Sequence, residues 1–192
     1  MDIDLIGRFE RVAVPLDGRR AAAVAIVISG DAEPVIWLTR RATGMRAHPG
    51  QFALPGGRID PGEDAVAAAL RELDEELGVT ASPADCLGLL DDYPTRSGYV
   101  ITPVVLRLGG APRPRPNPAE VAHVHVIGVR DLAVEPRFLT IPESDRPVIQ
   151  LPLAGRLVHA PTAAVLYQFR EAALYGRTTR VAHLGQPVFA WR

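Results

Sequence analysis

Three glutamates stand close together within residues 57–79. Glu72 and Glu76 are one helical turn apart, and Glu75 adjoins them. Carboxylates crowded on one side of a helix repel each other, and a divalent cation relieves that repulsion. Because every ligand atom would be oxygen, Mg²⁺ or Mn²⁺ is the expected ion. Mg²⁺ is usually coordinated by substrate phosphates as well as by protein carboxylates. The segment therefore predicts metal-assisted chemistry on a phosphate ester or anhydride. A solvated acidic helix face is the alternative.

The helix expected to carry these glutamates covers residues 61–77. Asp60 is the expected N-cap, Pro61 is at the first helical position, and Glu63 completes a capping-box-like start. Gly78 is a natural residue to end the helix. One stripe of the helix is aliphatic, formed by Val66, Leu70, Leu73 and Leu77. The helix is thus expected to pack by this stripe and to present its carboxylates from another side.

Short runs rich in β-branched residues predict strands around this helix. Residues 21–28 and 34–40 flank a Ser-Gly-Asp turn and suggest a hairpin. Residues 110–118 form a Pro-rich loop without strand potential. Further strands are expected at 86–91, 99–108, 120–129, 148–151 and 156–159, a short helix at 3–11 and a final helix at 162–175. This order predicts one α+β domain over residues 1–192, with a mixed β-sheet between helices, a short N-terminal extension and a C-terminal helix.

The composition is that of an ordinary globular protein, with 47% hydrophobic and 22% charged residues in a chain of 192. A net charge of −1 gives no global field that would attract nucleic acid or an anionic membrane. Cys86 is the single cysteine, which excludes an internal disulfide and favours a reducing compartment. The N-terminus is unlike a signal peptide, and the longest apolar run, at 21–28, is too short to span a bilayer. The expected location is the cytoplasm.

The motif around the glutamates resembles the Nudix box, with every motif position occupied. It consists of Gly57, Glu63 and the run Arg71-Glu72-Leu73-Asp74-Glu75-Glu76-Leu77-Gly78-Val79. The resemblance implies an α/β/α sandwich and metal-dependent hydrolysis of a nucleoside diphosphate linked to another moiety. It also implies that Glu72, Glu75 and Glu76 are metal ligands and that Arg71 orients a carboxylate.

Two roles within the motif region stay open. Glu63 could pair with Arg71, hold a metal through water, or act only as a helix cap. The general base is either Glu72 or Glu120, which stands at the entry to a strand after the Pro-rich loop. Glu120 could equally be an ordinary solvent-facing strand residue. His123 and His125 are interpreted as half-buried strand residues rather than as a metal-binding pair.

Residues upstream of the box are similar to the signature of coenzyme A pyrophosphatases in the same superfamily. They run Leu38-Thr39-Arg40-Arg41 and Met45-Arg46-Ala47-His48-Pro49-Gly50-Gln51-Phe52-Ala53-Leu54-Pro55-Gly56-Gly57. Residues 97–105 and 117–121 also resemble that subfamily. The chain departs from the subfamily pattern at Glu63, commonly aspartate, and at Leu54, commonly phenylalanine. It also has Ala160-Pro161 where the subfamily commonly carries Trp-Gly.

The arginines before the box are the expected phosphate-binding residues, because guanidinium matches phosphate oxygens with paired donors. They are Arg40, Arg41 and Arg46, each of which could instead make a surface ion pair. The other expected substrate-binding residues are His48, Gln51, Gly56, Gly57 and Tyr99. His48 could instead shape the glycine-rich loop, and Tyr99 could pack beside the sheet.

Together these features predict a Mg²⁺- or Mn²⁺-dependent pyrophosphohydrolase of coenzyme A or its derivatives. ADP-ribose, dinucleotides and noncanonical nucleotides are alternative substrates, since specificity resides in loops outside the box. A nucleotide-binding regulator without turnover is a third hypothesis. The expected partner is a small nucleotide-type molecule, without nucleic acid or membrane. Dimers are common in the family that the chain resembles, so a homodimer is compatible with it.

Overall fold

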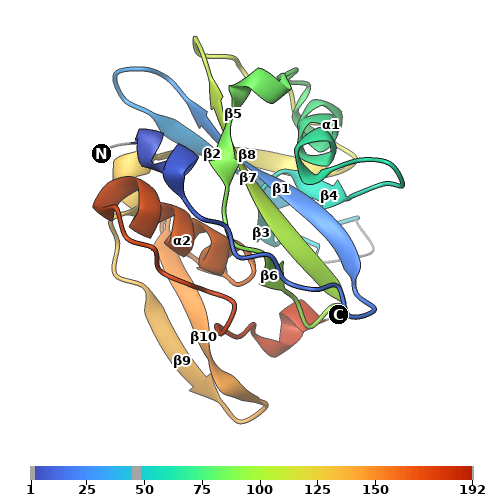
Figure 1. Ribbon diagram of the computed structural model, residues 1–192, viewed down its shortest axis with the longest axis vertical. Coiled ribbons are helices and arrows are strands. Elements are labelled where there is room, and N and C mark those ends of the chain that lie inside the picture. Colours follow the sequence, from blue (N-terminus) through green and yellow to red (C-terminus); the bar gives the residue numbers. More distant parts are fainter. Residues whose placement is uncertain (1–2, 45–48, 192) are drawn as a thin grey trace.

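The computed structural model describes residues 3–44 and 49–191 and consists of a central mixed sheet with helices on both sides (Figure 1). The main sheet has eight strands, and a second sheet has three. In chain order the elements are η1 (Ile3–Arg8), β1 (Arg20–Ser29), β2 (Val35–Arg41), β3 (Phe52–Ala53), β4 (Gly56–Arg58), α1 (Ala65–Leu77), η2 (Pro83–Asp85), β5 (Cys86–Leu89), β6 (Tyr93–Pro94), β7 (Tyr99–Leu108), β8 (Val121–Gly128), η3 (Val129–Leu132), β9 (Arg137–Ile141), β10 (Ser144–Leu153), β11 (Arg156–His159), α2 (Thr162–Tyr175) and η4 (Val188–Trp191). The predicted α+β class with a mixed sheet is confirmed.

Strand β1 organises the main sheet because it changes antiparallel partner along its length. Its far end pairs with β2, with Ile28 opposite Ile36, whereas its first half pairs with β4, with Val24 opposite Gly56. On its other side, β7 runs parallel to it over its whole length. β2 therefore diverges from β1 and pairs with β3 and β8 instead. The sheet splits between β2 and β4, which leaves room for a cavity beside β1.

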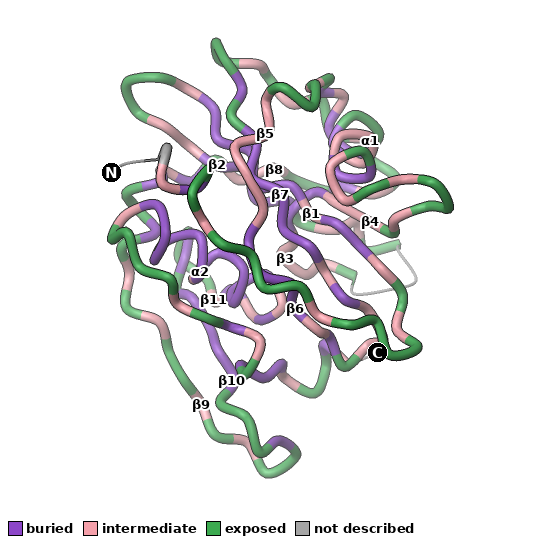
Figure 2. Tube along the Cα trace, viewed as in Figure 1, coloured by how far each residue is buried: buried purple, intermediate pink, exposed green. Residues whose placement is uncertain are grey.

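Alternation along β1 produces two hydrophobic cores, one on each face of the sheet. Ala23, Ala25 and Val27 pack with α1, whereas Ile26 and Ile28 pack with α2 and β10. Figure 2 shows the resulting pattern, in which β1, β7 and α2 are largely buried and β9 is largely exposed. The sheet is thus covered on both faces, as a sandwich of this class requires.

Helix α1 begins at Ala65, four residues later than the sequence analysis expected. Gly62 adopts a left-handed conformation with φ of 90°, so Pro61-Gly62 forms a turn instead of the first helical turn. Asp64 is the N-cap and accepts a hydrogen bond from the Ala67 N–H at 2.8 Å. The prediction of Asp60 as N-cap is therefore wrong. The end at Gly78 is confirmed, with φ of 58° at this residue.

Helix α2 has the bounds that the sequence predicted, and almost its whole surface is buried. Its Gln168 is fully buried, accepts a hydrogen bond from the Asp91 N–H at 3.0 Å and donates one to the Asp91 carboxylate at 2.8 Å. Arg180 and Arg11 then pair with Asp91 and Asp92 at 2.7 and 2.8 Å. These charge-assisted contacts to two buried carboxylates tie the segment after η1 and the segment after α2 to the sheet.

Two other expectations for the chain differ in extent. Residues 148–151 belong to a longer strand, β10, and the sequence analysis did not foresee β9, which pairs with it. The expected helix at 3–11 is a shorter 3-10 helix, η1.

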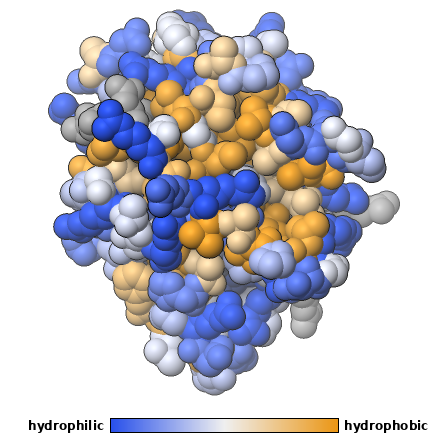
Figure 3. Space-filling view, in the orientation of Figure 1, coloured by the Kyte–Doolittle hydropathy of each residue, from blue (hydrophilic) through white to orange (hydrophobic). Residues whose placement is uncertain are grey.

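Hydropathy varies across the face drawn in Figure 3, where a band of hydrophilic side chains lies between hydrophobic patches. Within the described part of the chain, no helix has the length and apolar character needed to cross a membrane.

Candidate active site

A cavity of about 420 Å³ lies where the sheet splits, between β4, α1 and the start of α2. Ala22 and Val24 of β1 are among the residues that line it. Three carboxylates reach its wall from two different elements: Glu72 and Glu76 of α1, and Glu120 just before β8. Arg41 and Arg58 also line this cavity, so it offers carboxylates to a cation and guanidinium groups to an anion.

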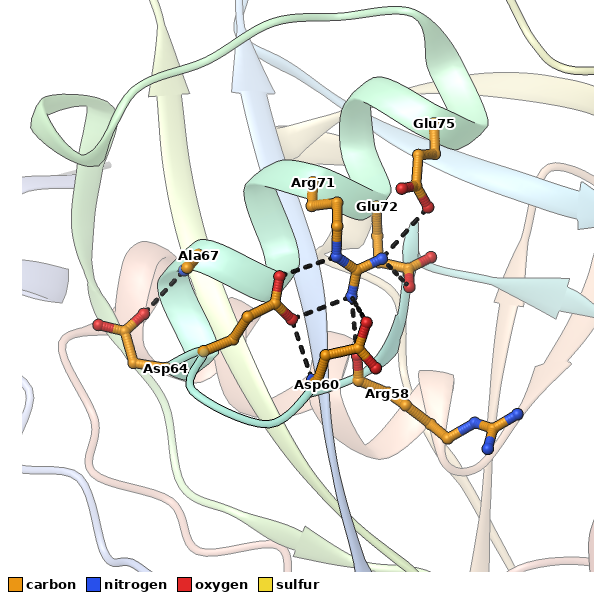
Figure 4. Close-up of polar contacts among 8 residues, drawn as sticks. Arg58, Asp60, Asp64, Ala67, Arg71, Glu72 and Glu75 are labelled. Carbon is orange, nitrogen blue, oxygen red and sulfur yellow. Dashed lines mark hydrogen bonds and ion pairs between the residues drawn. The ribbon is translucent and has the colours of Figure 1, made fainter.

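Arg71 donates hydrogen bonds to acceptors in α1, in the turn before α1 and at the end of β4 (Figure 4). Its Nε donates to Glu63 Oε1 at 2.8 Å, and its Nη2 donates to Glu63 Oε2 at 3.1 Å. Its Nη1 donates to Glu72 at 2.8 Å and to Glu75 at 3.2 Å, and Nη2 also reaches the Arg58 carbonyl at 3.0 Å. The pairing of Arg71 with Glu63 is one of the alternatives left open by the sequence. The hydrogen bond from Arg71 also lowers the pKa of Glu63.

The three box glutamates differ sharply in environment. Glu76 is 4% exposed, whereas the side chain of Glu75 is 54% exposed and lies against Arg71 rather than in the cavity wall. Burial raises the pKa of Glu76 to about 8; Arg41 opposes this rise, while Glu72 and Glu120 add to it. Burial also raises the pKa of Glu72, although the hydrogen bond from Arg71 opposes it. Glu72, Glu76 and Glu120 therefore interact electrostatically around one cavity.

The Pro-rich loop explains why Glu120 reaches the box helix. The N–H groups of Arg115 and Asn117 donate to the carbonyls of Leu77 and Glu76 at 2.6 and 2.8 Å. These carbonyls belong to the last turn of α1, which has no intrahelical donors left to bond them. The loop thus bonds the free carbonyl groups at the end of α1, and it places Glu120 in the cavity wall.

The donor set of this cavity fits a hard divalent cation. Its carboxylates supply only oxygen, and one of them is buried. Burial raises the pKa of Glu72 and Glu76, and repulsion from neighbouring carboxylates adds to this rise. Within residues 3–44 and 49–191, no three His, Cys, Asp or Glu side chains are already gathered at metal-ligand spacing. Arg71 contributes to this arrangement, since it draws Glu72 and Glu75 toward its own guanidinium. Glu72 lies in the cavity lining while it is paired with Arg71, whereas Glu75 would have to turn away from Arg71 to reach a cation there.

The expected substrate-binding residues divide between this cavity and its surroundings. Those that line it are Arg41, Gln51, Gly56, Gly57 and Tyr99. Arg40 lines a neighbouring cavity instead. Arg46 and His48 lie outside the described residues.

Several lining residues were not expected from the sequence. Arg58 is the last residue of β4, Thr95 directly follows β6, and Gln186 and Ala190 come from the segment after α2. Gln186 is 2% exposed and accepts a hydrogen bond from the Arg96 N–H at 2.7 Å. Nothing in the composition of residues 186–190 marks them as part of a site, because only the tertiary fold brings them to it.

Two adjacent glycines provide a test of how Glu72 is placed. A Cβ at Gly57 would overlap the Glu72 carboxylate, whereas a Cβ at Gly56 would overlap the backbone of Ala23 and Val24. We expect Gly57→Ala to lower kcat about 10²-fold with little change in melting temperature, because a flexible carboxylate can move aside. Gly56→Ala should destabilise the fold by about 3 kcal/mol or more, because the β1 backbone cannot move. Steady-state kinetics and thermal melts of both variants measure this, and equal activity in Gly57→Ala and the wild type would contradict it.

The pKa of Glu76 predicts how the stability of the cation-free protein depends on pH. The folded-state pKa of about 8 exceeds the ordinary value of 4.5, so folding takes up a proton between these values. The stabilising contribution is complete below pH 4.5 and is lost as the pH rises through about 8.

In a chelator, the melting temperature of the wild type should therefore fall relative to that of Glu76→Gln as the pH rises from about 5 to about 9. The full difference is on the order of 4 kcal/mol. Thermal melts of both proteins across this range test the expectation. Parallel curves would show that Glu76 does not titrate in this way.

Comparison with known proteins shows likeness in sequence and in fold. Residues 18–151 match the family model of the NUDIX domain. A protein of Photorhabdus laumondii subsp. laumondii named "Uncharacterized Nudix hydrolase NudL" is 37% identical over 127 residues, which cover 63% of this chain and 68% of that protein. A protein of the same name from Yersinia pestis is 46% identical over 87 residues, covering 45% of this chain and 44% of that protein. The matched region therefore spans less than half of the Yersinia relative.

Among solved structures, the Nudix hydrolase RenU from M. smegmatis has a TM-score of 0.56 and 18% sequence identity. The match covers 85% of this chain and 91% of that one. At this level of identity the likeness concerns the fold alone.

Proposed function

Because this chain belongs to the NUDIX domain family, whose hydrolases act on phosphoric anhydrides, we propose that it is a divalent-metal-dependent pyrophosphohydrolase of coenzyme A or its derivatives. The products from coenzyme A would be 4′-phosphopantetheine and adenosine 3′,5′-bisphosphate. The observation that carries the proposed reaction is the cavity that Glu72, Glu76 and Glu120 share.

In this proposal Glu72 and Glu76 hold the cation, and Glu75 or Glu120 completes its ligand set. The chemistry that a divalent cation would supply there is polarisation of the phosphoryl oxygens and a lower pKa for the attacking water. Arg71 positions Glu72 through the hydrogen bond of 2.8 Å and compensates for its charge. The role of Glu75 depends on its release from Arg71, since its carboxylate lies outside the cavity wall.

Proton transfer is assigned to Glu120, with Glu72 as the alternative base. Glu120 lies in the cavity wall, while Arg71 engages Glu63, Glu72 and Glu75. A carboxylate that is not held in a strong ion pair can accept the proton of an attacking water.

Glu120→Gln should therefore lower kcat more than it raises KM. An effect on KM alone would point to Glu72.

The remaining polar residues of the cavity are suited to hold the diphosphate. Arg41 offers a guanidinium that fits phosphate oxygens, and Gln51 and Tyr99 offer further hydrogen-bonding groups in the same wall. Ala22 and Val24 of β1 contribute apolar side chains to the same lining. The substrate proposal rests on the resemblance of residues 38–57 to coenzyme A pyrophosphatases. Arg41 and Gln51 belong to this segment and line the cavity.

A product-resolved assay tests the proposal. Coenzyme A, ADP-ribose, NADH, diadenosine polyphosphates and nucleoside triphosphates are each incubated with the protein and Mg²⁺ or Mn²⁺, and the products are separated by chromatography. We expect coenzyme A to have the highest kcat/KM and to yield the two products named above. Rapid hydrolysis of ADP-ribose without cleavage of coenzyme A would replace the substrate proposal, and binding of nucleotides without any turnover would replace the proposed reaction.

A further inference from the structure

A second cavity, of about 490 Å³, lies beside the first one and differs from it in charge. The two cavities share a wall made of Gln51, Phe52, Pro161 and Thr162. The side chains of Arg40, Arg156 and His159 line the second cavity, and no Asp or Glu does so among the described residues. The first cavity therefore combines three glutamates with Arg41 and Arg58, whereas the second has arginines without a described carboxylate and is suited to an anion.

Strand geometry explains why two consecutive arginines line different cavities. Arg40 and Arg41 are consecutive in β2, so their side chains project to opposite faces of the sheet. Arg41 lines the first cavity, where it influences the pKa of Glu76, and Arg40 lines the second. The Nε of Arg40 donates to the Gly50 carbonyl at 3.3 Å. Within the described part of the chain, neither Arg40 nor Arg156 forms a salt bridge with a carboxylate.

The surroundings of His125 show that Arg40 and Arg156 lie near each other at the second cavity. His123 lies opposite Arg40 across the β2–β8 pair, and the rings of His123 and His125 are 4.5 Å apart. The pKa of His125 is lowered, first by burial and then by His123, Arg40 and Arg156. Both arginines therefore lie close enough to act on the same imidazole, although more than a hundred residues separate them in the chain.

An exposed aromatic ring completes the second cavity. Phe189 is 51% exposed, and its ring lies 5.0 Å from that of His159 in an edge-to-face arrangement. Such a ring offers a stacking surface for a nucleobase, while the guanidinium groups nearby fit a doubly charged phosphate.

We propose that the second cavity binds a phosphate monoester of the same substrate molecule whose diphosphate occupies the first cavity. Arg40 and Arg156 bind the phosphate, and Phe189 packs against the adjoining base. The inference rests on the proposed function, in which the substrate is coenzyme A, and it selects the 3′-phosphate of that molecule as the group bound. It goes beyond the proposed function because it makes this phosphate a determinant of substrate choice.

The test compares coenzyme A with 3′-dephospho-coenzyme A, which differ only in that phosphate. The wild type should have a higher kcat/KM for coenzyme A, and Arg156→Ala and Arg40→Ala should each reduce the ratio of the two values about tenfold or more. Arg137→Ala is the matched control, because it removes the same charge from an exposed position in β9 outside both cavities. It should leave the ratio unchanged. An unaltered ratio in Arg156→Ala and Arg40→Ala, or no preference in the wild type, would overturn the inference.

A binding measurement separates this inference from the proposed reaction. Calorimetry with adenosine 3′,5′-bisphosphate and with adenosine 5′-monophosphate should show tighter binding of the bisphosphate by the wild type and equal binding by Arg156→Ala. If coenzyme A is not cleaved but this difference is found, the phosphate subsite stands and the proposed substrate falls. If coenzyme A is cleaved and both nucleotides bind equally to the wild type, the subsite falls and the proposed function stands.

Discussion

Glu76→Gln is expected to reduce kcat about 10³-fold, which corresponds to roughly 4 kcal/mol of transition-state stabilisation. Glu76 is the most buried of the box glutamates, at 4% exposure, and its carboxylate lies in the cavity wall. Glutamine preserves the shape of this side chain but removes the negative charge that would bind a cation. Because the buried carboxylate is costly to ionise, the substitution should not lower stability.

Asp74→Asn is the matched control for this experiment. Asp74 is an exposed residue of the same helix, and its carboxylate accepts a hydrogen bond from Thr80 at 3.1 Å rather than facing the cavity. It should retain full activity. Steady-state kinetics at saturating Mg²⁺ and Mn²⁺ measure both variants. Wild-type activity in Glu76→Gln would show that the acidic cavity is not the reaction centre.

Removal of divalent cations is expected to lower turnover at least about 10³-fold while the fold is retained. The core contacts around α1 do not depend on a cation, since Leu73 and Leu77 are fully buried against the sheet. Arg71 already pairs with Glu72 and Glu75, so these two carboxylates keep a positive partner when the cation is absent. The loss should therefore affect catalysis and leave folding intact.

The measurement combines activity with circular dichroism after dialysis against a chelator at about pH 6.5. Addition of Mg²⁺ or Mn²⁺ should restore the rate, whereas Ca²⁺ tests the demand for a small, octahedral ion. The same titration with Glu76→Gln provides the control for non-specific effects of the cation. Activity that persists in the chelator, or unfolding on removal of the cation, would contradict the assignment.

Local signals explain which elements could be predicted from the sequence. Helix α2 was predicted with its observed bounds, because Gly176 ends it in a left-handed conformation and an apolar run precedes that residue. The start of α1 was predicted wrongly, because Asp60 and Asp64 are both good caps and only the left-handed Gly62 decides between them. Strand β9 was missed, because its residues are mostly exposed and its order depends on pairing with β10.

In the candidate site, too, the sequence predicts contacts between neighbouring positions but not contacts between distant segments. The arrangement of Arg71 with Glu63, Glu72 and Glu75 is set by spacing within a single helix and the turn before it, so the sequence indicated that these residues belong together. The position of Glu120 depends on the docking of the Pro-rich loop on the end of α1. The second cavity unites Arg40 with Arg156 and Phe189 across distant segments, and no sequence periodicity predicts such a meeting.

The opposite projection of Arg40 and Arg41 has a consequence for directed evolution. In the proposed arrangement, a library at positions 40, 156 and 189 would vary substrate selection while the box glutamates remain untouched. Point substitutions there keep the register of β2, whereas inserting or deleting one residue would exchange the faces on which the two arginines lie. Substitutions rather than changes of length are therefore the safer route to new substrate preferences in this protein.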